Sequence, residues 1–271
     1  MVSELPWNAK TGTLKRELAQ GMMDPASRRA LEAGLQIKET RAKEGAETQI
    51  TVISMGPPMA EEILYQAIAL GADRGILLSD RRMAGADTFL TSFILARCIQ
   101  QQAADVDLVL CGSQTSDSET GQVGPQLAGE LSLPAIGYAS QIQLQGRGVR
   151  VQRHVDDFLE VLEMDLPGLV TIDLGACTPR YGAFGGVQDA FEDADILCVD
   201  ARQLGLDENF HAVKDSPTRI VEVYSPITQK ENIVLKGTAK TVVDQLFEGY
   251  GKIISSAMGK DLKTHAHEEG L

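Results

Sequence analysis

Apolar and polar positions in the first half of the chain follow two alternating patterns. Short apolar runs at residues 47–55, 75–79 and 108–111 predict β-strands. Segments with apolar residues at helical spacing lie between or after them, at residues 60–70 and 87–102. Strands that alternate with helices at this spacing predict βαβ units and a parallel sheet.

Two of the predicted helices begin with recognisable capping residues. Asp24 precedes Pro25, which gives an N-cap followed by proline at the first helical position. Asp87 and Thr88 cap the helix that extends to about residue 102. The buried stripe predicted for that helix consists of Phe89, Phe93, Ile94 and Ala96.

The pattern changes after residue 134. Four strand-like segments follow one another without helices, at residues 136–144, 149–155, 158–164 and 170–174. A glycine-containing turn at residues 145–148 predicts a hairpin between the first two. We therefore expect antiparallel strands at one edge of the sheet.

Regular signals are sparse from residue 200 until a helical segment at residues 240–256. We predict an extended C-terminal arm that packs on another subunit, because its apolar residues have few predicted partners in their own chain. These apolar residues are Leu204, Leu206, Phe210, Val221, Val223 and Tyr224. The predicted organisation is an N-terminal extension (1–22), a nucleotide-binding α/β domain (23–199) and the arm (200–271), which ends in a frayed tail from residue 260.

Composition and charge exclude several classes of function. A net charge of −13 over 271 residues argues against nucleic acid and anionic membrane surfaces as partners. No apolar run approaches the ~18–20 residues that a membrane span needs, so we expect no membrane insertion. The cysteines Cys98, Cys111, Cys177 and Cys198 contain no CxxC pair and favour reduced thiols in a cytoplasmic protein.

Residues 107–131 are the strongest candidate for a binding site. An apolar strand leads into a loop of small polar residues and then into a helix, an arrangement that lets backbone N–H groups and the helix dipole hold a phosphate. The loop contains no lysine and no GxxxxGK[ST] motif, so it is not a phosphoryl-transfer P-loop. Composition alone supports a binding loop and an ordinary connecting loop equally.

No catalytic or metal-binding constellation is predicted elsewhere. His154 lies in a strand pattern with no nucleophile nearby in sequence. The acidic pair 156–157 and the acidic residues between 189 and 195 are interpreted as solvated faces rather than metal ligands. Redox or group-transfer chemistry would then belong to a bound cofactor, which the protein positions.

The segment Asp117-Ser-Glu-Thr-Gly-Gln-Val-Gly-Pro125 resembles the nucleotide-binding loop of electron-transfer flavoprotein β subunits. The likeness extends over about residues 11–225. Further motifs in the order of that family are Met55-Gly-Pro-Pro58, Ala69-Leu-Gly-Ala-Asp-Arg74, Gly85-Ala-Asp-Thr88, Leu166-Pro167 and Pro179-Arg-Tyr181. The resemblance implies a doubly wound, mainly parallel, Rossmann-like sheet that binds an adenine nucleotide, with an antiparallel edge and an extended C-terminal arm.

By this resemblance, the chain pairs with an α subunit in a flavin-carrying heterodimer. The Asp-x-x-Thr-x-Gln-Val-Gly-Pro form is closer to the electron-bifurcating group, which implies a second FAD here and NADH as electron donor. One electron would pass to ferredoxin or flavodoxin and the other through the α-subunit FAD to a dehydrogenase or quinone-linked partner. The alternatives are a respiratory-type subunit with structural AMP, or a universal-stress-like nucleotide-binding module, for which a long arm has no obvious use.

The resemblance also implies individual site residues. Cofactor-binding residues are expected at Ser54, Met55, Gly56, Asp87, Thr88, Ser92, Gly112, Asp117, Thr120, Gly121, Gln122, Val123 and Gly124. Partner-docking residues are expected at Arg180, Tyr181 and Phe184, with Phe184 as an apolar anchor; the alternative is a Phe184 buried in the core. Acidic residues follow this loop where the respiratory type has lysines, so we expect a partner other than the usual acyl-CoA dehydrogenase surface.

One departure from the family pattern affects the sheet. Family members begin with a strand before the segment that matches residues 11–21, and residues 1–5 are too short and polar to replace it. Omission of a strand near the middle of the sheet leaves ladder hydrogen bonds unmade. We expect a start upstream of Met1 or a strand contributed in another way, and the nucleotide contacts of that first loop cannot be assigned to this chain.

Overall fold

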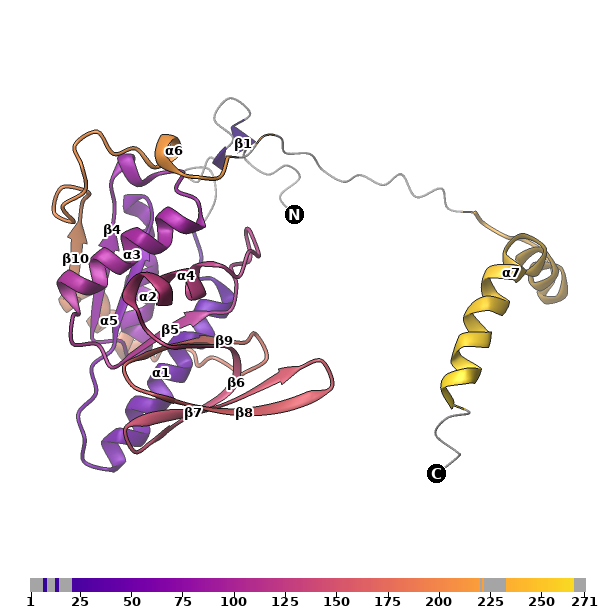
Figure 1. Ribbon diagram of the computed structural model, residues 1–271, viewed down its shortest axis with the longest axis horizontal. Coiled ribbons are helices and arrows are strands. Elements are labelled where there is room, and N and C mark those ends of the chain that lie inside the picture. The colour runs from indigo at the N-terminus through magenta and orange to yellow at the C-terminus, as the bar shows by residue number, and fades with distance from the viewer. Residues whose placement is uncertain (1–6, 9–12, 15–20, 220, 222–232, 266–271) are drawn as a thin grey trace. The chain divides into compact units, whose positions relative to one another are not determined.

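A computed structural model describes residues 7–8, 13–14, 21–219, 221 and 233–265. The chain divides into two compact units, residues 1–223 and residues 224–271. The first unit contains two β-sheets and most of the helices (Figure 1). It also contains a short antiparallel pair, β1 (Trp7–Asn8) with β2 (Thr13–Leu14).

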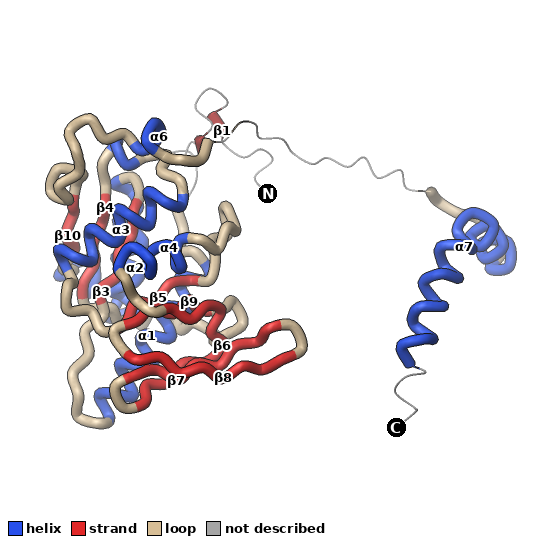
Figure 2. Tube along the Cα trace, in the orientation of Figure 1, coloured by secondary structure: helices blue, strands red, loops and turns tan. Residues whose placement is uncertain are grey.

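The larger strands form two separate sheets (Figure 2). A three-stranded parallel sheet has the order β10-β4-β3, with β3 at Thr51–Met55, β4 at Arg74–Leu78 and β10 at Ile196–Val199. A five-stranded mixed sheet has the order β5-β9-β6-β7-β8. Its strands are β5 (Leu108–Gly112), β6 (Ala135–Gln145), β7 (Gly148–Val155), β8 (Phe158–Asp165) and β9 (Gly168–Ile172). The α/β fold with a parallel sheet and an antiparallel edge is as predicted.

Helices lie on both faces of the strands. Helices α3 and α4 pack together on one face, while α1, α2 and α5 group on the other. Their bounds are α1 (Pro25–Lys43), α2 (Glu61–Leu70), α3 (Thr88–Gln102), α4 (Val123–Leu131) and α5 (Phe184–Asp193), with short 3-10 turns η2 (Pro58–Ala60) and η3 (Arg81–Met83). Asp24 and Asp87 are N-caps of α1 and α3, as the sequence predicts.

The antiparallel edge follows from two tight hairpins. Gln145 pairs with Gly148 across the first and Val155 with Phe158 across the second. Val149, Val151 and Met164 point into a core cluster, while polar residues such as Arg150 alternate with them on the exposed face. This alternation is the pattern expected of a sheet with one covered face.

The two sheets do not join at β3 and β5. Strand β3 pairs with β4, strand β5 pairs with β9, and no described strand lies between β3 and β5. Side chains of both strands line one shared cavity instead. The break lies in the middle of the predicted sheet.

The buried stripe of α3 differs from the prediction at its first residue. Leu90, Ile94 and Cys98 form a fully or nearly fully buried row, and Ala96 and Ile99 are buried beside it. Phe89 is 46% exposed, so its prediction as a core residue is wrong. A four-residue spacing keeps Leu90, Ile94 and Cys98 on one helix face, and Phe89 is turned about 100° away from it.

The segment after residue 200 folds back on its own chain. Leu204 is fully buried and Leu206 is 9% exposed, and both join a core cluster with β4 and α3. Phe210 packs against the same cluster. The prediction that Leu204, Leu206 and Phe210 pack on another subunit is therefore wrong. A turn at Gly205, with φ of +67°, directs the chain back to the core of its own unit.

The rest of the predicted arm is described in part. The short helix α6 (Ala212–Asp215) follows, and Val221 is 97% exposed. Val223 and Tyr224 lie outside the described residues. In the second unit, α7 (Ala239–His265) is longer than the predicted helix and includes residues expected in a frayed tail. Its exposed apolar residues include Val243, Phe247 and Tyr250.

Candidate functional site

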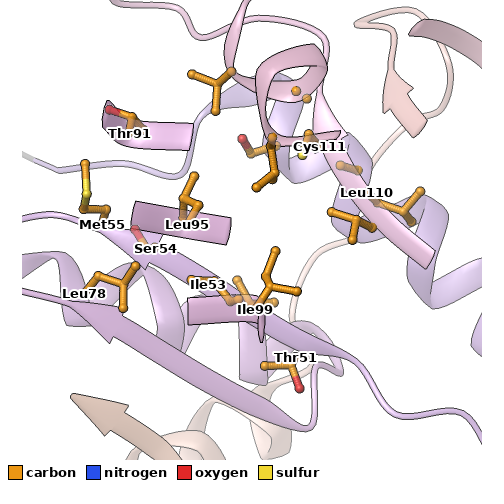
Figure 3. A pocket seen from close by; sticks show the side chains of 18 of the residues that line it. Thr51, Ile53, Ser54, Met55, Leu78, Thr91, Leu95, Ile99, Leu110 and Cys111 are labelled. Atoms are coloured by element: carbon orange, nitrogen blue, oxygen red, sulfur yellow. The ribbon is translucent and has the colours of Figure 1, made fainter. Parts of the chain in front are cut away.

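A cavity of about 2860 Å³ runs along the gap between β3 and β5 and includes the carboxyl ends of β3, β4 and β5. It exceeds the ~300–1,000 Å³ typical of a small-molecule pocket because it also includes the gap between β3 and β5. Figure 3 shows Ile53 and Met55 of β3, Leu95 and Ile99 of α3, and Leu110 of β5 around this cavity. The gap is therefore apolar, whereas the loop ends of the strands carry the polar groups.

The loop after β5 is fixed by hydrogen bonds to other elements. One oxygen of Asp24 caps α1, accepting from Ala26 N at 2.9 Å, and the other accepts from Ser116 N at 2.7 Å. Ser113 N donates to Ile172 O at 2.9 Å, and the hydroxyls of Thr115 and Ser118 lie 2.8 Å apart. These contacts hold the backbone of the loop in place before any ligand binds.

Two helix N-termini meet at the mouth of the cavity. Helices α3 and α4 begin at Thr88 and Val123, and the Thr88 hydroxyl donates to the side-chain oxygen of Gln122 at 2.8 Å. The unpaired N–H groups and the dipole of α4 provide partial positive charge, because α4 has no side-chain cap, whereas the Asp87 carboxylate caps α3. Such ends favour phosphate groups, so this part of the cavity is suited to a nucleotide.

Two glycines permit the close packing that brings these elements together. A Cβ atom on Gly112 would lie 2.7 Å from the carbonyl carbon of Ala26. A Cβ atom on Gly124 would lie 2.5 Å from Cγ2 of Thr171. The glycines at these positions therefore let α1 approach the end of β5 and α4 approach β9.

Asp87 lines the cavity, but its carboxylate forms hydrogen bonds with the start of α3 and with Thr218. Its carboxylate accepts hydrogen bonds from Leu90 N at 2.9 Å, Thr218 N at 3.0 Å and the Thr218 hydroxyl at 2.8 Å. Burial alone raises the pKa of the Asp87 carboxyl, but these hydrogen bonds outweigh it and hold the pKa below its usual value. Asp87 therefore remains ionised as a structural anion.

All but one of the predicted cofactor-binding residues line this cavity. They come from two strand ends, the loop after β5 and two helix starts: Ser54, Met55, Gly56, Asp87, Thr88, Gly112, Asp117, Thr120, Gly121, Gln122, Val123 and Gly124. Ser92 does not line it. Its fully buried hydroxyl donates to Thr88 O at 2.8 Å and lies 3.2 Å from Val123 O, so it joins α3 to α4 instead.

The chain matches a known protein family over most of this unit. The family described as "Electron transfer flavoprotein domain" matches residues 11–196. The chain belongs to the electron transfer flavoprotein β-subunit family. It is 36% identical over 238 residues to the electron transfer flavoprotein subunit beta of Thermoanaerobacterium thermosaccharolyticum, covering 88% of this chain and 89% of the relative.

Two further relatives carry names of reductase complexes. The caffeyl-CoA reductase-Etf complex subunit CarD of Acetobacterium woodii is 38% identical over 236 residues, or 87% of this chain and 88% of the relative. The acryloyl-CoA reductase electron transfer subunit gamma of Anaerotignum propionicum is 34% identical over 243 residues, or 88% and 89%. Membership in the electron transfer flavoprotein family disfavours the universal-stress-like alternative.

Of the three predicted docking residues, Arg180 is engaged in ion pairs within the chain, whereas Tyr181 and Phe184 are exposed. Arg180 is held internally: its guanidinium donates to Glu32 at 2.8 and 3.0 Å and also to Glu39. Hydrogen bonds and charge from Glu32 and Glu39 raise the pKa of Arg180. Tyr181 and Phe184 are 88% and 89% exposed, so the alternative of a core Phe184 is wrong.

The lining residues that the sequence analysis missed include Arg81 in η3, Lys214 in α6, and Thr218 and Arg219 after α6. No short motif marks them, because α6 returns to the cavity through tertiary packing. No group of three or more potential metal ligands occurs among the described residues, and none of the described helices has the length and apolar character to cross a membrane.

We expect the cysteines to differ in reactivity with iodoacetamide. Burial raises the pKa of Cys98 and of Cys111 to about 11, so both thiols stay protonated near neutral pH. Cys198 is exposed and should be alkylated first, at least about tenfold faster. Peptide mass spectrometry after timed labelling of the folded chain measures the order, and faster labelling of Cys98 would contradict it.

Proposed function

We propose that this chain binds FAD in the cavity and serves as the NADH-accepting subunit of an electron-bifurcating electron transfer flavoprotein. The observation that carries the proposal is the convergence of β3, α3 and the 112–124 loop on one cavity. The flavin would supply the redox chemistry, and the chain would hold its phosphates and orient it. An α subunit with its own FAD, a dehydrogenase, and ferredoxin or flavodoxin complete the proposed system.

The residues present fit a dinucleotide. Loop hydroxyls and the uncapped N-terminus of α4 are suited to the phosphates, and the ends of β3 and β4 offer backbone groups for the adenosine. The apolar part of the cavity beside Ile53 and Leu95 offers space for the flavin ring system. A respiratory-type subunit with AMP would use the phosphate end of the same cavity.

The experiment that tests the proposal is a cofactor count. The chain is co-expressed and co-purified with its α subunit, the nucleotides are released with acid, and FAD and AMP are quantified per heterodimer. Two FAD support the proposal. One FAD with one AMP would make the chain a respiratory-type subunit, and no nucleotide beyond one FAD would contradict nucleotide binding in this cavity.

We also propose that the exposed surface of Tyr181, Phe184, Val187 and Phe191 docks the dehydrogenase. Phe191 stacks on Tyr65 with ring centroids 4.9 Å apart, which fixes part of this apolar surface. Exposed aromatic residues are frequent interface anchors. The acidic residues Asp189, Glu192 and Asp193 beside it favour a basic partner surface.

Phe184→Ala is expected to raise the KM for the dehydrogenase by about tenfold, since a truncated anchor commonly costs more than ~1 kcal/mol of binding energy. Stability should change by less than about 0.5 kcal/mol, because the side chain is 89% exposed. Phe158→Ala, at a 73% exposed phenylalanine on β8, is the matched control. An equal loss in both variants would contradict a docking role specific to Phe184.

A further inference from the structure

Residues 212–219, here called the arm base, form part of the cavity wall. Thr218 donates two hydrogen bonds to the Asp87 carboxylate, and Asp87 N donates to the hydroxyl of Ser216 at 3.0 Å. Ser216 is 6% exposed. These bonds join the arm base to the start of α3, although the two segments lie about 130 positions apart in sequence.

A second contact fixes the other end of the arm base. Helix α6 packs against η3, where Ala212 is fully buried and Met83 is 3% exposed. Arg81 belongs to η3 and Lys214 to α6, so this contact places two cationic residues on adjoining elements. The arm base is therefore attached to the cavity at two points rather than at one.

Two hydrogen bonds, joined by the peptide link between Asp87 and Thr88, connect the arm base to the nucleotide loop. Thr218 bonds to Asp87, Thr88 follows Asp87 in the chain, and the Thr88 hydroxyl donates to Gln122 at 2.8 Å. The arm base thus reaches the same mouth of the cavity as the 112–124 loop. A phosphate group held by that loop would lie within the field of charges on the arm base.

Three cationic groups line the cavity at this point, together with the carboxylates of Asp80, Asp87 and Asp117. Arg81, Lys214 and Arg219 line it, are exposed, and form no ion pair with another described residue. Nearby carboxylates are engaged: Asp80 bonds to Arg82 at 2.9 Å, and Asp87 bonds to Thr218. The 112–124 loop itself contains no lysine or arginine.

We propose that Arg81, Lys214 and Arg219 bind the phosphate groups of the nucleotide, and that Asp87 is a positioning residue that holds Lys214 and Arg219 at the cavity. This inference rests on the proposed function, because it assigns residues to the same nucleotide site. It supplies the positive charge that the loop lacks. Arginine and lysine form charge-assisted hydrogen bonds with phosphate that neutral loop groups cannot match.

The arrangement couples ligand binding to the docking of the arm base on the cavity wall. A ligand that bonds to Lys214 and Arg219 stabilises the docked arm base, and by thermodynamic linkage a docked arm base raises the affinity for the ligand. The segment that leads toward the second unit would then respond to whether the nucleotide site is filled. Bound ADP should therefore slow amide hydrogen exchange in residues 212–219 of the wild-type chain.

The test measures ADP and adenosine binding by calorimetry to the chain co-purified with its α subunit, after bound nucleotide has been removed. Lys214→Gln combined with Arg219→Gln should weaken ADP binding by about tenfold to a hundredfold, and adenosine binding by less than about twofold. The dependence of ADP affinity on salt should also become less steep, since two screened charges are removed. Arg202→Gln removes one exposed charge outside the cavity and is the control for net charge.

Further variants separate phosphate binding from a structural role. Lys214→Arg combined with Arg219→Lys should retain most ADP affinity, because both charges remain. Asp87→Asn should speed exchange in residues 212–219 and weaken ADP more than adenosine. Equal losses for ADP and adenosine, or an unchanged ADP affinity in the double Gln variant, would overturn the inference while leaving the nucleotide site intact. A wild-type chain that binds neither probe would overturn the proposed function as well.

Discussion

Replacement of Arg180 by alanine is expected to lower the free energy of unfolding by about 2–4 kcal/mol. Glu32 has a side chain that is only 7% exposed, and Arg180 supplies its ion pair from the loop before α5. Removing one partner leaves a buried carboxylate without its counter-charge, which costs about 3–5 kcal/mol in fully buried pairs. The value here is reduced because Arg180 is 32% exposed. Urea denaturation of the variant and the parent chain measures the difference.

Glu39→Ala is the control for the Arg180 prediction. Glu39 also pairs with Arg180, but its side chain is 56% exposed, so its loss should cost less than about 1 kcal/mol. Arg180→Lys should fall between the two, since it keeps the charge but not the forked geometry. Equal losses for Arg180→Ala and Glu39→Ala would show that the buried Glu32 pair does not determine stability.

The effect of Arg180→Ala should also depend on pH. Burial raises the pKa of Glu32, but hydrogen bonds from Arg180 and Gln36 and the charge of Arg180 outweigh it and lower the pKa below 4.5. A lowered folded-state pKa stabilises the fold above the unfolded-state pKa, and this stabilisation is lost as the pH falls through the folded-state pKa. The difference in the free energy of unfolding between Arg180→Ala and the parent chain should therefore be largest near neutral pH and decrease below about pH 4.

Gly112→Ala is expected to destabilise the chain by about 1–3 kcal/mol and to reduce nucleotide content in the co-purified heterodimer. The added Cβ would lie 2.7 Å from backbone atoms of Ala26 and Ser27, and backbone cannot move aside as a flexible side chain can. The start of α1 would be displaced, and with it Asp24, which holds Ser116 of the nucleotide loop. Thermal unfolding and released FAD measure the two effects.

Gly129→Ala is the matched control for the crowding at Gly112. A Cβ on Gly129 meets no atom within 4 Å, and alanine is favoured over glycine inside a helix by about 0.5–1 kcal/mol. The control should therefore be unchanged or slightly more stable, with normal nucleotide content. A Gly112→Ala chain that is as stable as Gly129→Ala would show that α1 adjusts freely at this contact.

Local sequence signals predicted most of the helices and strands, but not β10 or α6. The start of α3 was predicted because an Asp N-cap and a helical apolar pattern coincide at Asp87. The cavity residues in β3 and in the 112–124 loop were implied by the family resemblance, and their positions at strand ends and helix starts agree with a site at one edge of an α/β sheet. Capping residues and apolar periodicity depend on residues close in sequence, so they can be recognised without knowledge of the tertiary structure.

The failures concern residues whose environment is set by distant segments. Ser92 lies one turn after a correct helix start, but its hydroxyl faces α4 rather than the cavity. Leu204 and Leu206 belong to no periodic segment, and a turn at Gly205 buries them. Lys214 and Arg219 carry no motif, and tertiary contacts hold their segment at the cavity: hydrogen bonds between Asp87 and both Ser216 and Thr218, and the packing of α6 on η3.

The break between β3 and β5 has a consequence for the behaviour of the chain in solution. Each strand leaves one edge of backbone N–H and C=O groups without a strand partner among the described residues, and both edges border the same apolar cavity. Such edges are templates for strands of other molecules. A preparation of this chain alone should therefore form concentration-dependent aggregates rich in intermolecular β-structure. Light scattering and amide infrared spectra over a dilution series would report them.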